Sequence, residues 1–246
     1  MGIFTLVIYQ PIYNLLVFLY DILPFGGVGL AIIILTIIIR GILFPLTYKS
    51  MKSQKDMQEI QPMIKEIQTK YKDDKEKMAQ ELMAVYKVHK VNPFASCLPL
   101  LIQLPVFIGL FQALRNGLGA VDATMLYSFV SNPGVIEPMF LGFMDLSVVS
   151  IPLAILAAAS QYFQVKQTMA RQPAKEVREK KGAMDENMAA QMSKTMLYVM
   201  PVMSLVIGVT SLPGGVMLYW LATTLVSIVT YLIMFPSKKK AVEEKK

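Results

Sequence analysis

The sequence of 246 residues has few of the side chains from which enzymes build active sites. It contains one cysteine, Cys97, and one histidine, His89. A single cysteine excludes an internal disulfide, and its apolar surroundings favour a buried, unreactive thiol. His89 lies in the lysine-rich segment YKVHKV, so the apolar segments hold neither a histidine metal cluster nor a Ser/His/Asp triad. We therefore expect no enzymatic activity, no cofactor and no metal.

Charged residues are also scarce. They make up 17% of the chain, against roughly 25% in ordinary soluble domains. Hydrophobic residues make up 54% of the chain and the mean hydropathy is +0.49. This composition indicates an integral membrane protein with one membrane domain.

Five apolar segments have the length of about 17 to 25 residues that a membrane-spanning helix requires. They are residues 28–48, 94–114, 146–165, 196–212 and 216–235. Only the turn SLPGG separates the last two, which predicts a tight helical hairpin. We therefore predict an all-α membrane protein with five transmembrane helices.

The distribution of Lys and Arg predicts the orientation, because short cytoplasmic loops are enriched in these residues. Ten lie in segment 49–93, seven in segment 166–195 and five in the tail 236–246. Residues 1–27 and the SLPGG turn have none, and loop 115–145 has only Arg115. We therefore place the N-terminus and loop 115–145 outside the cytoplasm, and the C-terminus inside it.

Residues 1–27 lack the basic start of a signal peptide. At helical spacing their polar residues fall on one stripe, with tyrosines beside it: Gln10, Asn14 and Asp21, flanked by Tyr9, Tyr13 and Tyr20. We predict an amphipathic helix that lies in the outer membrane interface with its polar edge in water. A sixth span is the alternative.

Segment 49–93 contains two amphipathic patterns separated by the charged sequence KDDKEK. The first consists of Met57, Ile60, Ile64, Ile67 and Tyr71, and the second of Met78, Leu82, Val85 and Tyr86. We predict a cytoplasmic helical hairpin, in which Pro62 marks a bend or a late helix start. Its basic charge indicates orientation and attraction to anionic lipid, with contact to a ribosome or nascent chain as the alternative.

Arg40 is a cation within the first predicted span, about 12 Å from the cytoplasmic end at 1.5 Å per residue. Its burial costs about 2.5 to 3.5 kcal/mol. Either its side chain reaches the headgroups, or it faces a hydrated cavity open to the cytoplasm. Without an Asp or Glu in any span, it is available to an external anion such as an acidic peptide. Polar residues for such a cavity are Gln103, Gln112, Ser160, Gln161, Gln164, Thr223, Thr224 and Ser227.

Several segments resemble the YidC/Oxa/Albino family of membrane insertases. They are IIIRGILFPLTYKSMKSQKDMQ around Arg40, QPMIKEIQTKYKDDKEKMAQELMAVYK, NPFASCLPLLIQLPVFIGLFQALR and SLPGGVMLYWLATTLVSIVTY. Their order is specific, and the resemblance covers essentially the whole chain. It implies a five-helix membrane core around a hydrophilic groove that is open to the cytoplasm and lipid, with a helical hairpin at its mouth.

The resemblance also implies roles for individual residues. Arg40 matches the groove arginine of the family, Trp220 the aromatic residue of the fifth span, and Gln161 the polar position of the third, with Gln164 as the alternative. With Gln103 these residues form the expected substrate-binding groove. Tyr162, Phe163, Tyr219 and Tyr231 are candidates for a surface along which substrate slides, with helix packing or interfacial anchoring as the alternative.

The expected function is that of an insertase in the bacterial plasma (inner) membrane, which takes hydrophobic segments of nascent proteins from the cytoplasm into the bilayer. The ribosome and the Sec translocon are further candidate partners, and no specific nucleic-acid sequence is expected. The chain lacks the large extracytoplasmic domain of many family members, so we expect a short-form bacterial member or a version trimmed to the core. A small transporter or channel for an anionic solute is the alternative function.

Overall fold

The computed structural model describes residues 2–23, 27–92, 98–169 and 195–235. The chain forms two compact units. The first comprises residues 1–43, 101–164 and 201–246, and the second residues 44–100 and 165–200. The predicted tail 236–246 and most of the predicted loop 166–195 lie outside the described residues.

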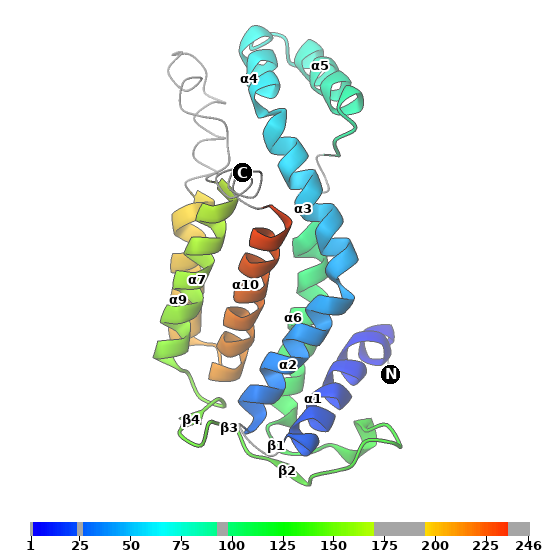
Figure 1. Ribbon diagram of the computed structural model, residues 1–246, viewed down its shortest axis with the longest axis vertical. Coiled ribbons are helices and arrows are strands. Elements are labelled where there is room, and N and C mark those ends of the chain that lie inside the picture. Colours follow the sequence, from blue (N-terminus) through cyan, green and yellow to red (C-terminus); the bar gives the residue numbers. More distant parts are fainter. Residues whose placement is uncertain (1, 24–26, 93–97, 170–194, 236–246) are drawn as a thin grey trace, which may run out of the picture. The chain divides into compact units, whose positions relative to one another are not determined.

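The first unit is built from helices (Figure 1). They are η1 (Thr5–Tyr9), α1 (Gln10–Ile22), α2 (Gly27–Ile42), α6 (Leu98–Gly117), α7 (Ile151–Met169), α9 (Met200–Thr210) and α10 (Gly214–Met234). Within the described ranges, the stretches Thr5–Ile22 and Gly214–Met234 are long and apolar enough to cross a membrane. A third span results when Gly27–Ile42 and Phe44–Met57 are counted together. The helical class is confirmed, and the number of five spans stays a prediction.

The first predicted span, residues 28–48, is not one continuous helix. Helix α2 ends at Ile42 and α3 (Phe44–Glu59) begins two residues later. Pro45 has no N–H to donate, and its ring clashes with the carbonyl of the residue four positions earlier in an unbroken helix. That residue is Gly41, which itself weakens a helix interior. The break places Arg40 in the last turn of α2, where the helix dipole favours a cation.

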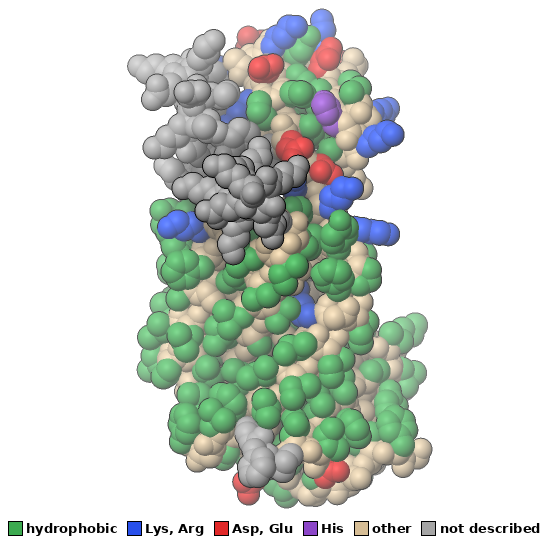
Figure 2. Space-filling view, in the orientation of Figure 1, with side chains coloured by type: hydrophobic (Ala, Val, Ile, Leu, Met, Phe, Trp, Pro, Cys, Tyr) green, Lys and Arg blue, Asp and Glu red, His purple; other side chains and the backbone are tan. Residues whose placement is uncertain are grey.

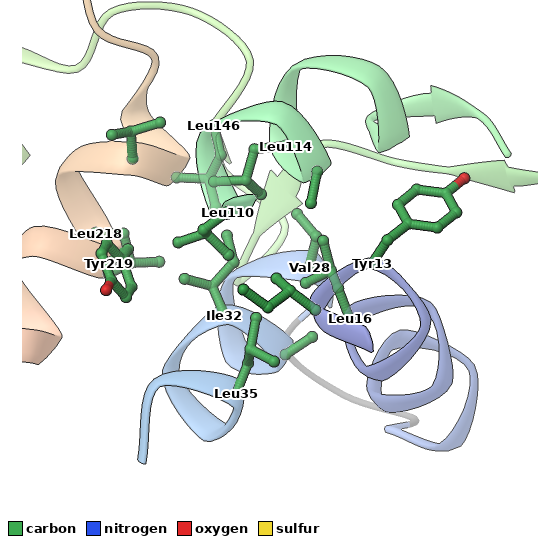
Figure 3. Close-up of a cluster of buried hydrophobic side chains, with 14 of the residues drawn as sticks. Tyr13, Leu16, Val28, Ile32, Leu35, Leu110, Leu114, Leu146, Leu218 and Tyr219 are labelled. Atoms are coloured by element: carbon green, nitrogen blue, oxygen red, sulfur yellow. The ribbon is translucent and has the colours of Figure 1, made fainter. Parts of the chain in front are cut away.

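The hydrophobic core of the first unit joins α1, α2, α6 and α10 (Figure 3). Leu16, Ile32 and Leu110 are fully buried at its centre. Leu146, which precedes α7, is equally buried, and the backbone N–H of Gly215 donates to its carbonyl at 2.9 Å. The loop before α7 is therefore fixed to the start of α10.

The segment predicted as a plain loop, 115–145, contains short antiparallel hairpins. Strand β1 (Gly119–Ala120) pairs with β2 (Val135–Ile136), and β3 (Met139–Phe140) pairs with β4 (Met144–Asp145). The 3-10 turn η3 (Ala123–Met125) lies between β1 and β2. Gly27 forms a bridge with Phe140 at φ +59°, and a Cβ there would lie 2.2 Å from the Met139 carbonyl oxygen. Glycine is therefore required where α2 meets this loop.

The prediction that the polar edge of the N-terminal helix faces water is wrong for Asn14. Its side chain is 2% exposed, and its Nδ2 donates to the carbonyl of Met125 at 2.8 Å. Its Oδ1 accepts from the backbone N–H of Tyr127 at 2.6 Å. Gln10 also donates to the Met125 carbonyl, while Asp21 is exposed. Gln10 and Asn14 of the polar stripe therefore bind loop 115–145, because buried amides require partners.

The second unit contains α3, α4 (Gln61–Lys70) and α5 (Lys75–Val88). Pro62 lies in the first turn of α4, so the expectation of a late helix start is the one that the structure adopts. Asp74 caps α5 by accepting from the Lys77 N–H at 3.0 Å. Apolar residues of both predicted patterns pack together, namely Ile60 and Ile64 with Met57, Leu82, Val85 and Tyr86.

Candidate functional site

Arg40 belongs to a chain of polar side chains that connects three helices of the first unit. Its Nη2 donates to Oε1 of Gln103 on α6 at 3.1 Å. The amide nitrogen of Gln103 donates in turn to the hydroxyl of Tyr219 on α10. One glutamine thus presents its acceptor to the cation and its donor to the phenol, which fixes the orientation of the amide.

Arg40 keeps its positive charge without a carboxylate beside it. Of the charged groups that the structure describes, none with a negative charge is bonded to Arg40, and Gln103 supplies its hydrogen bond. A guanidinium carries five N–H donors. Arg40 is half-buried, and none of its nitrogens is both buried and unbonded. N–H groups that do not bond Gln103 therefore remain for solvent or a ligand. Figure 2 shows that hydrophobic side chains cover most of the helical part of this face of the molecule.

The polar residues of α10 divide into two groups. The hydroxyls of Thr224 and Ser227 donate to carbonyls of their own helix, at 2.8 and 2.9 Å. These bonds use the hydroxyl protons within α10, so neither side chain depends on another helix for a hydrogen-bond partner. Thr223 lies one turn after Tyr219, and its hydroxyl is buried beside the phenol of that residue. Thr223 therefore extends the polar region beside Tyr219.

Gln161 lies in a second polar contact. Its Oε1 accepts from the hydroxyl of Ser204 at 2.6 Å, which joins α7 to α9. Ser204 is 3% exposed, and its single hydroxyl proton is shared between Gln161 and the carbonyl of Pro201, which lies 2.9 Å away. The structure bonds Gln161 to Ser204 and does not bond it to Arg40. Gln164, the alternative, is half-buried and has an interaction partner of its own.

The aromatic candidates occupy different environments. Trp220 is half-buried and packs edge-on against Phe107 of α6, with ring centroids 5.9 Å apart. Phe163 is 61% exposed, and Tyr162 packs edge-on against it. Tyr219 and Tyr231 are 3% and 7% exposed, so neither offers the open sliding surface expected of it. Tyr219 is buried because its hydroxyl has a polar partner inside the helix bundle.

Sequence reasoning missed two hydroxyl groups that organise these contacts. Tyr219 was a candidate because of its aromatic ring, whereas in the structure its hydroxyl is the group that accepts a hydrogen bond from Gln103. Ser204 lies in the apolar segment 196–212. A polar side chain within a predicted membrane span is the signal by which the sequence could have identified it. No group of three or more His, Cys, Asp or Glu that could hold a metal occurs in the described residues.

Comparison with known proteins decides the family. The model of the 60Kd inner membrane protein family matches residues 18–241. A Fusobacterium nucleatum protein named membrane protein insertase YidC is 36% identical over 210 residues, which cover 85% of this chain and 87% of that protein. The chain belongs to this family. Membership confirms the resemblance to the YidC/Oxa/Albino insertases and makes the protein a membrane protein.

Other members of the 60Kd inner membrane protein family differ in length. The YidC insertase of Pelobacter propionicus is 37% identical over 93% of this chain, but the match covers only 38% of that relative. The YidC 2 insertase of Listeria innocua is 35% identical over 89% of this chain and 68% of the relative. The matched region therefore spans most of some relatives and less than half of others.

Proposed function

We propose that this protein is a membrane protein insertase, which moves hydrophobic segments of newly made proteins from the cytoplasm into the bilayer. Family membership and the names of its relatives support this activity. In this proposal five apolar helical segments span the inner membrane. The N-terminus lies outside and the C-terminus in the cytoplasm, as the Lys and Arg distribution indicates.

Arg40 is the observation that carries the mechanism. It is a cation in an apolar helix, with an amide as its partner and donors to spare. We place Arg40 and Gln103 in a hydrophilic groove open to the cytoplasm, with Gln161, Gln164 and Trp220 along its walls. An acidic tail of the substrate enters this groove and binds Arg40, since charge-assisted hydrogen bonds are stronger than neutral ones.

Gln103 makes both binding and release possible. Its neutral Oε1 yields to a carboxylate and returns when the substrate leaves, so Arg40 is never without a partner. The amide nitrogen stays on Tyr219 and keeps Gln103 in place. Burial of about twenty apolar residues of the substrate in lipid supplies the net driving force. No covalent bond is made or broken.

The substrate's apolar segment moves along the exposed faces of α7 and α10. Phe163 and Leu156 of α7 are 61% and 53% exposed, and Val229 of α10 is 53% exposed. These side chains, rather than Tyr219 and Tyr231, provide the sliding surface. The partners in this proposal are nascent membrane proteins and lipid. The ribosome and the Sec translocon stay expectations from the resemblance.

Insertion into vesicles that contain the purified protein tests this proposal. Two substrates are compared that differ only in an acidic or an uncharged translocated tail. Arg40→Ala should lower insertion of the acidic one selectively, and Arg40→Lys should retain much of it. Arg115→Ala removes the same charge from an exposed position in the last turn of α6 and serves as the matched control. Equal insertion by wild type and Arg40→Ala would exclude Arg40 from the mechanism. Uptake of a small anion that depends on Arg40, without insertion, would identify a transporter instead.

A further inference from the structure

The outer hairpin β3–β4 displays hydrophobic side chains at its tip. Leu141 to Phe143 connect the two strands, and the N–H of Phe143 donates to the carbonyl of Phe140 at 3.3 Å to close the turn. Leu141 is 58% exposed and Phe143 72% exposed. Figure 1 shows this hairpin at the end of the bundle where α7 begins. Exposed Leu and Phe at a turn are unusual, because turns favour small polar residues.

The backbone of this turn favours other residues than leucine. Leu141 has φ 53° and Gly142 φ 78°, so both central residues are in the left-handed region. Asn, Asp and Gly adopt this conformation readily, whereas it is strained for a residue such as Leu. The exposed side chain of Leu141 gains little from packing within the protein to offset that strain. A function for the hydrophobic side chain itself is therefore indicated.

The exposed apolar surface continues from the hairpin into α7. Val148, Val149 and Ile151 follow the hairpin and are 56%, 40% and 58% exposed. Asp145 is the one charged residue in segment 138–165. Its carboxylate accepts from the hydroxyl and the N–H of Ser147 at 2.6 and 2.8 Å, and these bonds lower the pKa of Asp145. Such a locally satisfied carboxylate is compatible with the headgroup region.

The other hairpin of this loop has a mixed character. Its connection, residues 121–134, exposes Asp122, Thr124, Ser131 and Asn132 together with Phe129, which is 77% exposed. The Oδ1 of Asn132 accepts from the N–H of Gly134 at 2.9 Å, as expected of a turn in water. The three-residue tip of β3–β4, by contrast, has no polar side chain, and its apolar surface continues into α7.

We propose that the β3–β4 hairpin inserts into the outer lipid leaflet, with Leu141 and Phe143 among the acyl chains just below the headgroups. It anchors the outer end of α7 at a fixed depth, so that movements for substrate entry are confined to the cytoplasmic side. This inference rests on α7 being embedded in the membrane, which is part of the proposed function.

Spin-label accessibility in phosphatidylethanolamine and phosphatidylglycerol vesicles tests the anchor. Single cysteines replace Phe143, Asn132 and Leu156 in the full chain carrying Cys97→Ser. Oxygen concentrates in lipid and a nickel chelate in water. The label at 143 should collide more with oxygen than with nickel, as at 156, and the label at 132 should show the reverse. A label at 143 that behaves as at 132, or that is shielded from both reagents, would overturn the proposal. Water exposure at 156 would instead refute the embedding of α7.

A second variant separates lipid contact from loop structure. Leu141→Asn suits the left-handed backbone, so the thermal stability of the purified protein should stay equal or rise. The label at 143 should nevertheless gain accessibility to nickel and lose accessibility to oxygen. Leu141→Met, which preserves the apolar side chain, should keep the wild-type ratio. An unchanged ratio in Leu141→Asn would contradict the anchoring role of Leu141.

Discussion

Gln103→Glu places a carboxylate where the neutral acceptor of Arg40 now lies. The two side chains have almost the same shape, and the hydroxyl of Tyr219 can donate to the second carboxylate oxygen. The 3.1 Å contact with Arg40, which is already charge-assisted on the donor side, then becomes an ion pair, and we expect it to strengthen by about 1.5 to 3 kcal/mol. An incoming acidic tail has to displace this internal carboxylate. At 1.4 kcal/mol per factor of ten, its occupancy of Arg40 should fall about ten- to hundredfold.

The assay compares insertion rates in vesicles for substrates with an acidic and an uncharged tail, at equal amounts of reconstituted protein. Gln103→Glu should slow the acidic substrate and leave the uncharged one near the wild-type rate. Gln112→Glu adds the same charge to the same helix at a half-buried position and is the matched control. If both variants slow both substrates equally, or neither slows the acidic one, competition for Arg40 is refuted.

Three further predictions concern the contacts that support the site. Asn14→Ala leaves the N–H of Tyr127 without its 2.6 Å acceptor, so it should lower the free energy of unfolding by about 2 to 4 kcal/mol. Hydrogen exchange in loop 115–145 should become faster, and an unchanged exchange rate there would contradict the contact. Ser204→Ala removes the donor to Gln161 and should cost about 1 kcal/mol in thermal unfolding without favouring either substrate, so selective loss of the acidic one would place Gln161 with Arg40. Gly27→Ala forces a side chain at φ +59° towards a carbonyl and should cost more than 1 kcal/mol, while Gly41→Ala, with open space around it, should not.

Periodicity predicted the helices well because it depends on local sequence. The apolar faces of the second unit are an example, since Ile60 and Ile64 pack with residues of the second pattern as their spacing required. Pro45 within the first span predicts a bend, and the structure has a break after Ile42, next to Gly41. Hydrophobicity alone made residues 28–48 one segment, and the backbone restriction at proline is the stronger determinant there.

The outer loop and the site depended on contacts between residues far apart in the chain. Asn14 bonds backbone groups more than 110 positions away, so its helical stripe alone could not show that it is buried. In the same way, Gln103 was a candidate because it is polar at membrane depth, but its link to Tyr219 requires the packing of α6 against α10. Spacing identifies which side chains are unusual, and tertiary structure decides which of them meet.

The central claim is that the guanidinium of Arg40 is hydrated from the cytoplasmic side. Labelling of Arg40→Cys in a Cys97→Ser background measures this directly, with a membrane-impermeant thiol reagent added to vesicles whose cytoplasmic face is outward. The account predicts rapid labelling, far faster than at Leu156→Cys on the lipid-facing surface. Labelling at position 40 as slow as at position 156 would contradict it.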